Sequence, residues 1–132
     1  MKTNILISIH PQHVAKILSG EKRFEFRKKA PPETVKKMVI YATAPIMKVV
    51  AVAEINRKLS AKPESIWRKT RHASGITKQY FNAYFEERDI AHALEIGEVT
   101  QLDSPLALSD ISLELFPPQS YAFMDDSLVN KL

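Results

Sequence analysis

The 132-residue chain contains no cysteine. This absence excludes disulfide bonds, thiolate nucleophiles, iron–sulfur clusters and cysteine-based zinc sites, and it favours a reducing compartment. Only three glycines are present, at positions 20, 75 and 97, and they form no phosphate-binding loop, which excludes nucleotide triphosphatases and dinucleotide enzymes. No apolar run reaches the roughly 18–20 residues of a membrane span or forms a signal-peptide core. We therefore expect a cytoplasmic protein with no membrane partner.

The composition is typical of one globular domain. Hydrophobic residues make up 45% of the chain and charged residues 26%, and a chain of this length fits a single hydrophobic core. The sequence has no internal repeat, linker or low-complexity tract. We expect one domain over residues 1–132 with its core at about 4–124, and we expect the polar tail from Asp125 onward to fray.

Periodicity in the apolar residues predicts the first elements. Residues Asn4–Ile9 are typical of a buried strand, and Pro11–Ser19 of a short helix that ends at Gly20. From Lys22 onward apolar and charged residues alternate, which predicts a second strand with one charged face. The double proline at positions 31 and 32 then predicts a loop.

Later segments predict further strands and two helices. Strands are predicted at Val39–Ala42 and Val49–Ile55, which suit an antiparallel hairpin, and at Ile90–Val99. Helices are predicted to begin at Pro63 and after Thr77. One further strand is predicted at residues 106–108 or 111–113. Because strands cluster at both ends around a helical segment, we expect an α+β fold with a mixed, mainly antiparallel sheet or small barrel.

The charge is unevenly distributed along the chain. Up to Ser74 there are 16 lysines and arginines against 5 acidic residues, a net charge of +11, whereas the remainder carries 3 against 10, a net charge of −7. Folding can place such halves on opposite faces, so that a basic face binds a polyanion. The alternative interpretation is a solvated surface without a partner.

The most informative segment follows Gly20. Alternation in the second strand places Arg23, Glu25 and Arg27 on one face, next to Lys22. One interpretation is an exposed strand face with a local ion pair. The other is a binding cleft in which Lys22 supplies a compact cation and Arg27 a planar fork for a phosphate or a base, with Glu25 orienting one of them.

The histidines do not form a recognisable metal site. His10 and His13 are three residues apart, but the third and fourth ligands of a metal centre are not evident. We therefore expect no metal and no cofactor, and we interpret His13 as facing an anion at the start of the helix. His72 and His92 are isolated, which favours surface or core positions.

Aromatic residues predict a core more strongly than a stacking platform. Trp67 and the residues of the second predicted helix recur at helical spacing, which is typical of buried side chains. Tyr41 and Tyr121 lie next to turn residues, and we expect them to face a groove. The aromatic residues of the second helix are Tyr80, Phe81, Tyr84 and Phe85.

Several of these segments together resemble the ASCH domain, a branch of the PUA-like superfamily. Residues 7–11, 16–22 and 24–27 resemble its opening strand, helix and second strand, and the most discriminating pattern is Gly20-x-Lys22-x-x-Glu25-x-Arg27. The resemblance covers roughly residues 4–124. Segments 39–45, 52–55, 84–85, 93–96 and 117–120 support it.

This resemblance implies a pseudo-barrel of five or six strands with flanking helices. It also implies a cleft beside the first helix and second strand for RNA or a nucleotide-like ligand. Some family members cut single-stranded RNA, and others hydrolyse an acylated cytidine nucleoside with a lysine that Lys22 matches. In that second branch a threonine stands where this chain has Glu25. A carboxylate there is expected to pair with Lys22 and hold it protonated, which disfavours amide hydrolysis.

Our sequence-based interpretation is a module that binds RNA or a modified nucleoside in a basic cleft. One alternative is a small hydrolase in which Lys22 is the reactive or charge-stabilising group and Glu25 or Glu54 is the acid or base. Another is a ligand-sensing, transcription-linked regulator that uses the same cleft. The oligomeric state stays open. The predicted cleft residues are His13, Lys22, Glu25, Arg27, Tyr41 and Thr43.

Overall fold

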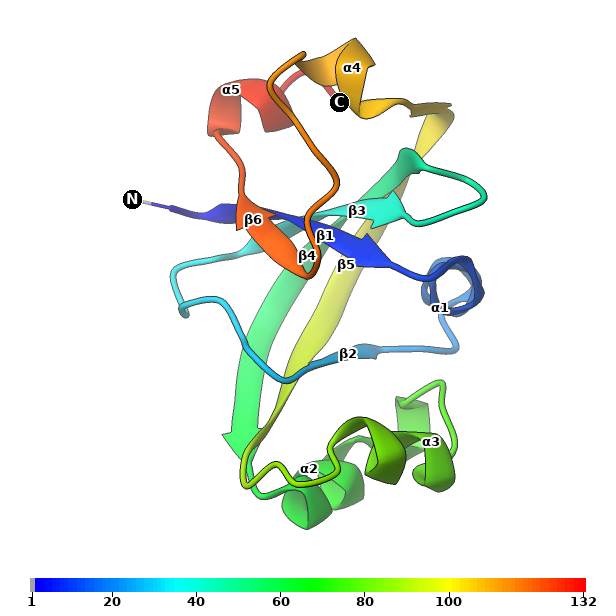
Figure 1. Cartoon of the computed structure of the whole chain (residues 1–132), viewed down its shortest axis with the longest axis vertical. Helices are drawn as coiled ribbons and strands as arrows, with labels where there is room; N and C mark the ends of the chain where they lie inside the picture. The colour runs from blue at the N-terminus through cyan, green and yellow to red at the C-terminus, as the bar shows by residue number, and fades with distance from the viewer. Residues whose placement is uncertain (1) are drawn as a thin grey trace.

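The fold is organised around one curled six-stranded sheet (Figure 1). The structure, a computed structural model, describes residues 2–132. The strand order is β2-β5-β4-β3-β1-β6, with β1 and β3 parallel and the other neighbours antiparallel. The strands are β1 (Asn4–Ile9), β2 (Phe24–Arg27), β3 (Lys37–Ala42), β4 (Lys48–Ala61), β5 (Ala91–Leu106) and β6 (Tyr121–Phe123). This confirms the α+β class and the mainly antiparallel sheet.

Short helices flank the sheet. The segment between β4 and β5, residues 62–90, carries α2, η1 and α3, and we call it the helical insert. The helices are α1 (Pro11–Ser19), α2 (Pro63–Thr70), the 3-10 turn η1 (Arg71–Ala73), α3 (Lys78–Tyr84), α4 (Leu108–Ile111) and α5 (Asp126–Val129). Within residues 2–132, no helix has the length and apolar character that crossing a membrane requires.

The sheet curls into a half-barrel because its longest strands are irregular. The pairing of β4 with β5 shifts register at three places, and that of β3 with β4 shifts once. Each such bulge bends the strands and increases their twist. Curling brings the edge strand β2 toward β1 without pairing the two strands, so the half-barrel has an open side between them.

Three hydrophobic clusters stabilise this arrangement. The first fills the concave side under α1 and includes Ile5, Ile7 and Ile9. The second covers the other face of β1, β3 and β4 and includes Leu6 and Val39. Alternation along β1 and β3 separates these two clusters. The third packs β2 against the helical insert through side chains that include Phe24, Phe26, Ile66, Phe81 and Phe85.

Several predicted elements have the expected bounds. The first strand and the first helix match residue for residue, and Gly20 ends α1 in the left-handed region with φ of 86°. Thr77 caps α3, since its side chain accepts a hydrogen bond from the Tyr80 backbone N–H. The predicted hairpin is formed by β3 and β4, although β4 extends to Ala61.

Two predictions in the C-terminal part are wrong. Residues 106–108 and 111–113 add no separate strand: β5 continues to Leu106, and the next residues form α4. The tail from Asp125 does not fray, because it forms α5 and packs Leu128, Val129 and Leu132 against the second cluster. Apolar burial over an otherwise open sheet face outweighs the polarity of the tail.

We expect the tail to contribute measurably to stability. Replacing Leu128 and Val129 together by alanine should lower the free energy of unfolding by about 2 kcal/mol, because two half-buried aliphatic side chains lose their packing. Urea unfolding measures this difference. Ser127→Ala on the exposed side of α5 is the control. Equal stability of the two variants would show that the tail is loosely attached.

Candidate functional site

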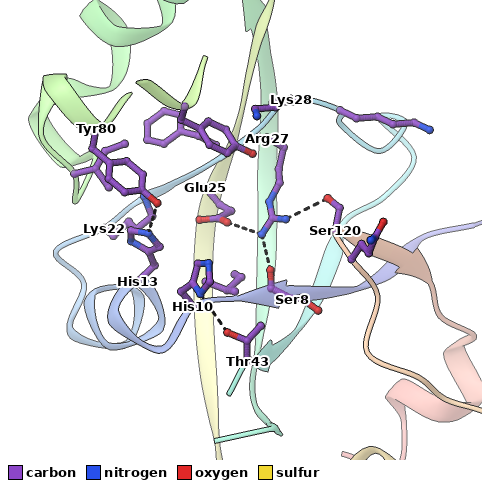
Figure 2. A pocket seen from close by; sticks show the side chains of 16 residues that line it. Ser8, His10, His13, Lys22, Glu25, Arg27, Lys28, Thr43, Tyr80 and Ser120 are labelled. Carbon is purple, nitrogen blue, oxygen red and sulfur yellow. Dashed lines mark hydrogen bonds and ion pairs between the residues drawn. The ribbon is translucent and has the colours of Figure 1, made fainter. Parts of the chain in front are cut away.

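A cavity of about 550 Å³ opens where β2 and β1 face each other without pairing (Figure 2). Its walls come from the end of β1, the start of α1, β2, the turn after β3, the helical insert and the segment before β6. These segments are distant in sequence. The cavity therefore exists only once the sheet has curled and the insert has packed against it.

The centre of the cavity wall is a buried ion pair between Glu25 and Arg27. Arg27 Nη2 lies 2.7 Å from Glu25 Oε2, and the two residues are 8% and 6% exposed. They face the same side because they are two residues apart on a strand. Arg27 also donates to the Ser8 carbonyl at 2.8 Å and to Ser120 Oγ at 3.2 Å. One guanidinium thus joins β2, β1 and the segment before β6.

Lys22 is buried beside this pair and is only 2% exposed. Its Nζ donates to the Ser74 carbonyl at 2.7 Å and lies 4.8 Å from the centre of the Phe26 ring. Among the described residues it makes no ion pair with a carboxylate. Burial lowers the pKa of Lys22 to about 8, opposed by the Glu25 charge and assisted by those of Lys16 and Arg27.

This geometry corrects one expectation from the sequence. Glu25 does not pair with Lys22, because Arg27 on the same strand face holds the carboxylate. The Glu25 charge still favours protonated Lys22, but the pKa is lowered all the same because desolvation is the larger effect. A lysine in this setting is partly unprotonated near neutral pH, so the expected Glu25–Lys22 pair does not hold it fully protonated.

Two histidines line the cavity at the start of α1. His13 Nε2 is 3.3 Å from the Tyr80 hydroxyl, whereas His13 Nδ1 is buried with no partner among the described residues. Burial, together with the Lys22 charge, lowers the pKa of His13, so its imidazole is neutral at neutral pH. His10 Nδ1 lies 3.3 Å from Thr43 Oγ1. The cavity therefore contains a neutral imidazole next to a buried amine.

Cations and a second tyrosine surround the mouth. Lys28 and Lys29 are exposed and line the cavity directly after β2. Lys28 Nζ lies 4.9 Å from the centre of the Tyr84 ring, and burial raises the pKa of the Tyr84 hydroxyl. Because these two ammonium groups are exposed, the mouth favours anionic ligands.

The structure brings together five of the six predicted cleft residues: His13, Lys22, Glu25, Arg27 and Thr43 all line the cavity. Tyr41 does not, which corrects that prediction. It is 3% exposed and lies in the second cluster, on the same face of β3 as Val39. Tyr121 packs against the first cluster instead of facing a groove, and Glu54 is exposed on β4 outside the cavity.

The helical insert contributes residues to the cavity that were not predicted from the sequence. Phe81 and Phe85 are buried as predicted, but Tyr80 is 43% exposed and lines the cavity together with Tyr84. A signal for this was present. Tyrosine occupies positions 80 and 84, and phenylalanine occupies positions 81 and 85. One line of side chains along this segment therefore ends in hydroxyl groups, and the adjacent line is entirely apolar. Other lining residues that were missed are Ser8, His10, Lys28, Lys29 and Ser120.

No three His, Asp or Glu side chains within residues 2–132 come together as a metal site.

The family model of the ASCH domain matches residues 7–100, most of the chain. The chain belongs to the ASCH domain family. The resemblance seen in the sequence is thereby confirmed.

Known proteins support this assignment. An ASCH domain-containing ribonuclease of Zymomonas mobilis is 27% identical over 131 residues, covering 96% of this chain and 88% of the relative. The crystal structure of ASCH from Zymomonas mobilis superposes with a TM-score of 0.89 at 25% identity, covering 98% of this chain and 92% of that one. The large ribosomal subunit protein uL22 of Ureaplasma parvum is 32% identical over 114 residues, 86% of this chain. The ASCH domain described here spans only 37% of that relative's length.

The Arg27 bridge should contribute strongly to stability. Arg27→Met leaves the buried Glu25 carboxylate unpaired, and we expect the free energy of unfolding to fall by about 3 kcal/mol or more. Arg57→Met is the matched control, since Arg57 pairs with Glu95 at 3.1 Å but is 61% exposed, and exposed pairs contribute about 1 kcal/mol or less. Urea unfolding of both variants measures the contrast. Equal losses would show that the bridge does not hold the open side together.

Burial of Lys22 predicts a specific pH dependence. The folded state binds this proton less tightly than the unfolded state, so stability should rise as pH increases from about 8 to 10.5. Lys22→Met removes the cost of burying the charge. We expect Lys22→Met to have a higher free energy of unfolding than the natural protein at pH 7. This difference should become smaller as the pH rises from about 8 to 10.5.

Urea unfolding at several pH values measures this advantage, and Lys69→Met controls for the loss of an exposed lysine. An advantage of Lys22→Met that stayed constant over the window would contradict the lowered pKa of Lys22.

Proposed function

We propose that this ASCH domain binds single-stranded RNA at the cavity and cleaves it there. The observation that carries the proposal is the buried Lys22 amine inside a cavity whose mouth carries Lys28 and Lys29. The Zymomonas relative named as a ribonuclease aligns over nearly the whole of both chains. The buried Lys22 amine inside the cavity and the exposed ammonium groups of Lys28 and Lys29 at its mouth suit a substrate that carries phosphates.

The size and lining of the cavity favour an unpaired nucleotide. A volume of about 550 Å³ lies in the range of small-ligand sites. The rings of His10, Tyr80 and Tyr84 offer flat surfaces on which unstacked bases can lie. Lys28 and Lys29 would neutralise flanking phosphates and release their counterions. Binding should weaken at higher salt, because releasing these ions into a more concentrated solution gains less entropy.

The same groups support cleavage by the RNA's own 2′-hydroxyl. Attack of that oxygen on the adjacent phosphorus breaks the bond to the 5′-oxygen and yields a cyclic phosphate and a 5′-hydroxyl end. One proton leaves the attacking hydroxyl, and one reaches the departing oxygen. We assign the first to the neutral His13 imidazole and the second to the Lys22 ammonium, which also stabilises charge on the phosphate. Glu25 then serves to fix Arg27 and is not itself the acid or base.

Hydrolysis of acylated cytidine is the second candidate, favoured by the state of Lys22 and by the size of the cavity. Lys22 has no carboxylate partner and a pKa of about 8, so a useful fraction of the amine is unprotonated at neutral pH. The cavity volume also suits a single nucleoside. Unlike the first candidate, this reaction needs no phosphate.

The deciding experiment compares three substrates: a single-stranded RNA, DNA of the same sequence, and acylated cytidine. We expect cleavage of RNA but not of DNA, because only RNA carries the attacking hydroxyl. Lys22→Met and His13→Ala should each lower the rate by about 100-fold or more, whereas the exposed Lys69→Met should not. Chromatography resolves the products.

Other outcomes separate the alternatives. Salt-sensitive RNA binding without cleavage would leave a binding module, and turnover of acylated cytidine alone would favour the second candidate. RNA that is neither bound nor cut would contradict the proposal.

A further inference from the structure

The Lys22 amine is held by a turn that lies about fifty residues away in the chain. Its only hydrogen-bond acceptor among the described residues is the Ser74 carbonyl, at 2.7 Å. Ser74 belongs to the helical insert and is 3% exposed, so water does not compete for this contact. Three consecutive carbonyls of the turn accept from the segment around Lys22: Ala73 from the Arg23 N–H at 2.8 Å, Ser74 from Lys22 Nζ, and Gly75 from Lys16 Nζ at 2.9 Å.

Gly75 provides the space for the Lys22 side chain. A Cβ atom at position 75 would lie 2.6 Å from Lys22 Cβ and 2.7 Å from Lys22 Cγ. These carbons belong to the base of the Lys22 side chain, and its Cβ atom cannot move away without moving the backbone between α1 and β2. Gly75 also has φ of +71°, in the left-handed region that glycine adopts without strain.

The turn itself is fixed by the Ser74 side chain. Ser74 Oγ donates to the Ile76 carbonyl at 3.0 Å and accepts from the Ile76 N–H at 3.4 Å. Both contacts orient the Ser74 carbonyl toward Lys22. The Lys22 side chain is therefore fixed at two points. Its Cβ and Cγ atoms have no free space beside Gly75, and its Nζ donates to the Ser74 carbonyl.

We propose that Ser74 and Gly75 are positioning residues for Lys22, Gly75 by leaving room for its stem and Ser74 by accepting its ammonium group. Neither residue lines the cavity. The consequence for catalysis rests on the proposed function, but the positioning itself does not. The helical insert thus positions a residue in the connection between α1 and β2.

The chain offers a matched control for the test. Gly20 also has a positive φ, +86°, but a Cβ atom there would meet nothing within 4 Å. Gly20→Ala therefore introduces backbone strain alone, whereas Gly75→Ala introduces strain and the collision with Lys22. Gly75→Asn separates the two effects at position 75, because asparagine tolerates the left-handed region but keeps the Cβ atom.

The measurement is the pKa of Lys22 by NMR of labelled lysine side chains, with its signal assigned by its absence in Lys22→Met. Displacement of the amine from Ser74 toward water should raise this pKa by about one unit or more in both Gly75 variants. Gly20→Ala should leave it at the natural value. If RNA is cleaved, the pH–rate profile should shift with it in the Gly75 variants.

An unchanged Lys22 pKa in the Gly75 variants would overturn the proposal, as would an equal shift in Gly20→Ala. Should the Gly75 variants not fold, the natural protein decides: the Ser74 carbonyl carbon should titrate at the same midpoint as Lys22, and absence of that coupling would overturn the proposal as well. None of these NMR titrations requires RNA. Failure of the proposed function and failure of the positioning proposal are therefore distinguishable.

Discussion

The Arg27 guanidinium holds together the open side of the half-barrel. The sheet ends at β2 on one side and at β6 on the other, and no backbone ladder joins β2 to β1. Arg27 supplies the missing connection through the Ser8 carbonyl and Ser120 Oγ, while Glu25 balances its charge (Figure 2). Burying such a group is costly unless its hydrogen bonds are made. Replacing a ladder by one side chain leaves space between the strands, and that space is the cavity.

The cavity in turn explains how a lysine can remain in the interior. Glu25 is held by Arg27 and acts on Lys22 only without a direct ion pair. Among the described residues the direct contacts of Lys22 Nζ are a backbone carbonyl and an aromatic ring. Such partners favour the ammonium less than a carboxylate would, so desolvation determines the pKa. Polar groups placed in this way reduce stability while keeping an amine of lowered pKa in the wall of the cavity.

The helical insert belongs to the site as much as the sheet does. Its aromatic residues Phe81 and Phe85 fix it against β2 through the third cluster. That anchoring places Tyr80 beside His13 and the Ser74 carbonyl against Lys22. The insert connects β4 and β5, which are long and paired over most of their length (Figure 1). These rigid strands hold the two ends of the insert in place.

The sequence by itself determined the local elements and the family. Local signals such as Pro11, Gly20 and Thr77 act over one helical turn, so the bounds of α1 and the cap of α3 could be predicted from them. Alternation in β2 likewise placed Glu25 and Arg27 on one face. Those rules depend only on neighbouring residues, and neighbours are what a sequence displays.

Tertiary structure alone decided which side chains meet. Whether Glu25 pairs with Lys22 or Arg27, whether Tyr41 faces a groove or a core, and whether the tail packs all depend on contacts between distant segments. Bulges in β4 and β5 set how far the sheet curls, and the curl sets which segments approach. Desolvation of Lys22 arises only from that enclosure, because its strength depends on the surrounding protein and not on the residues beside it in the chain.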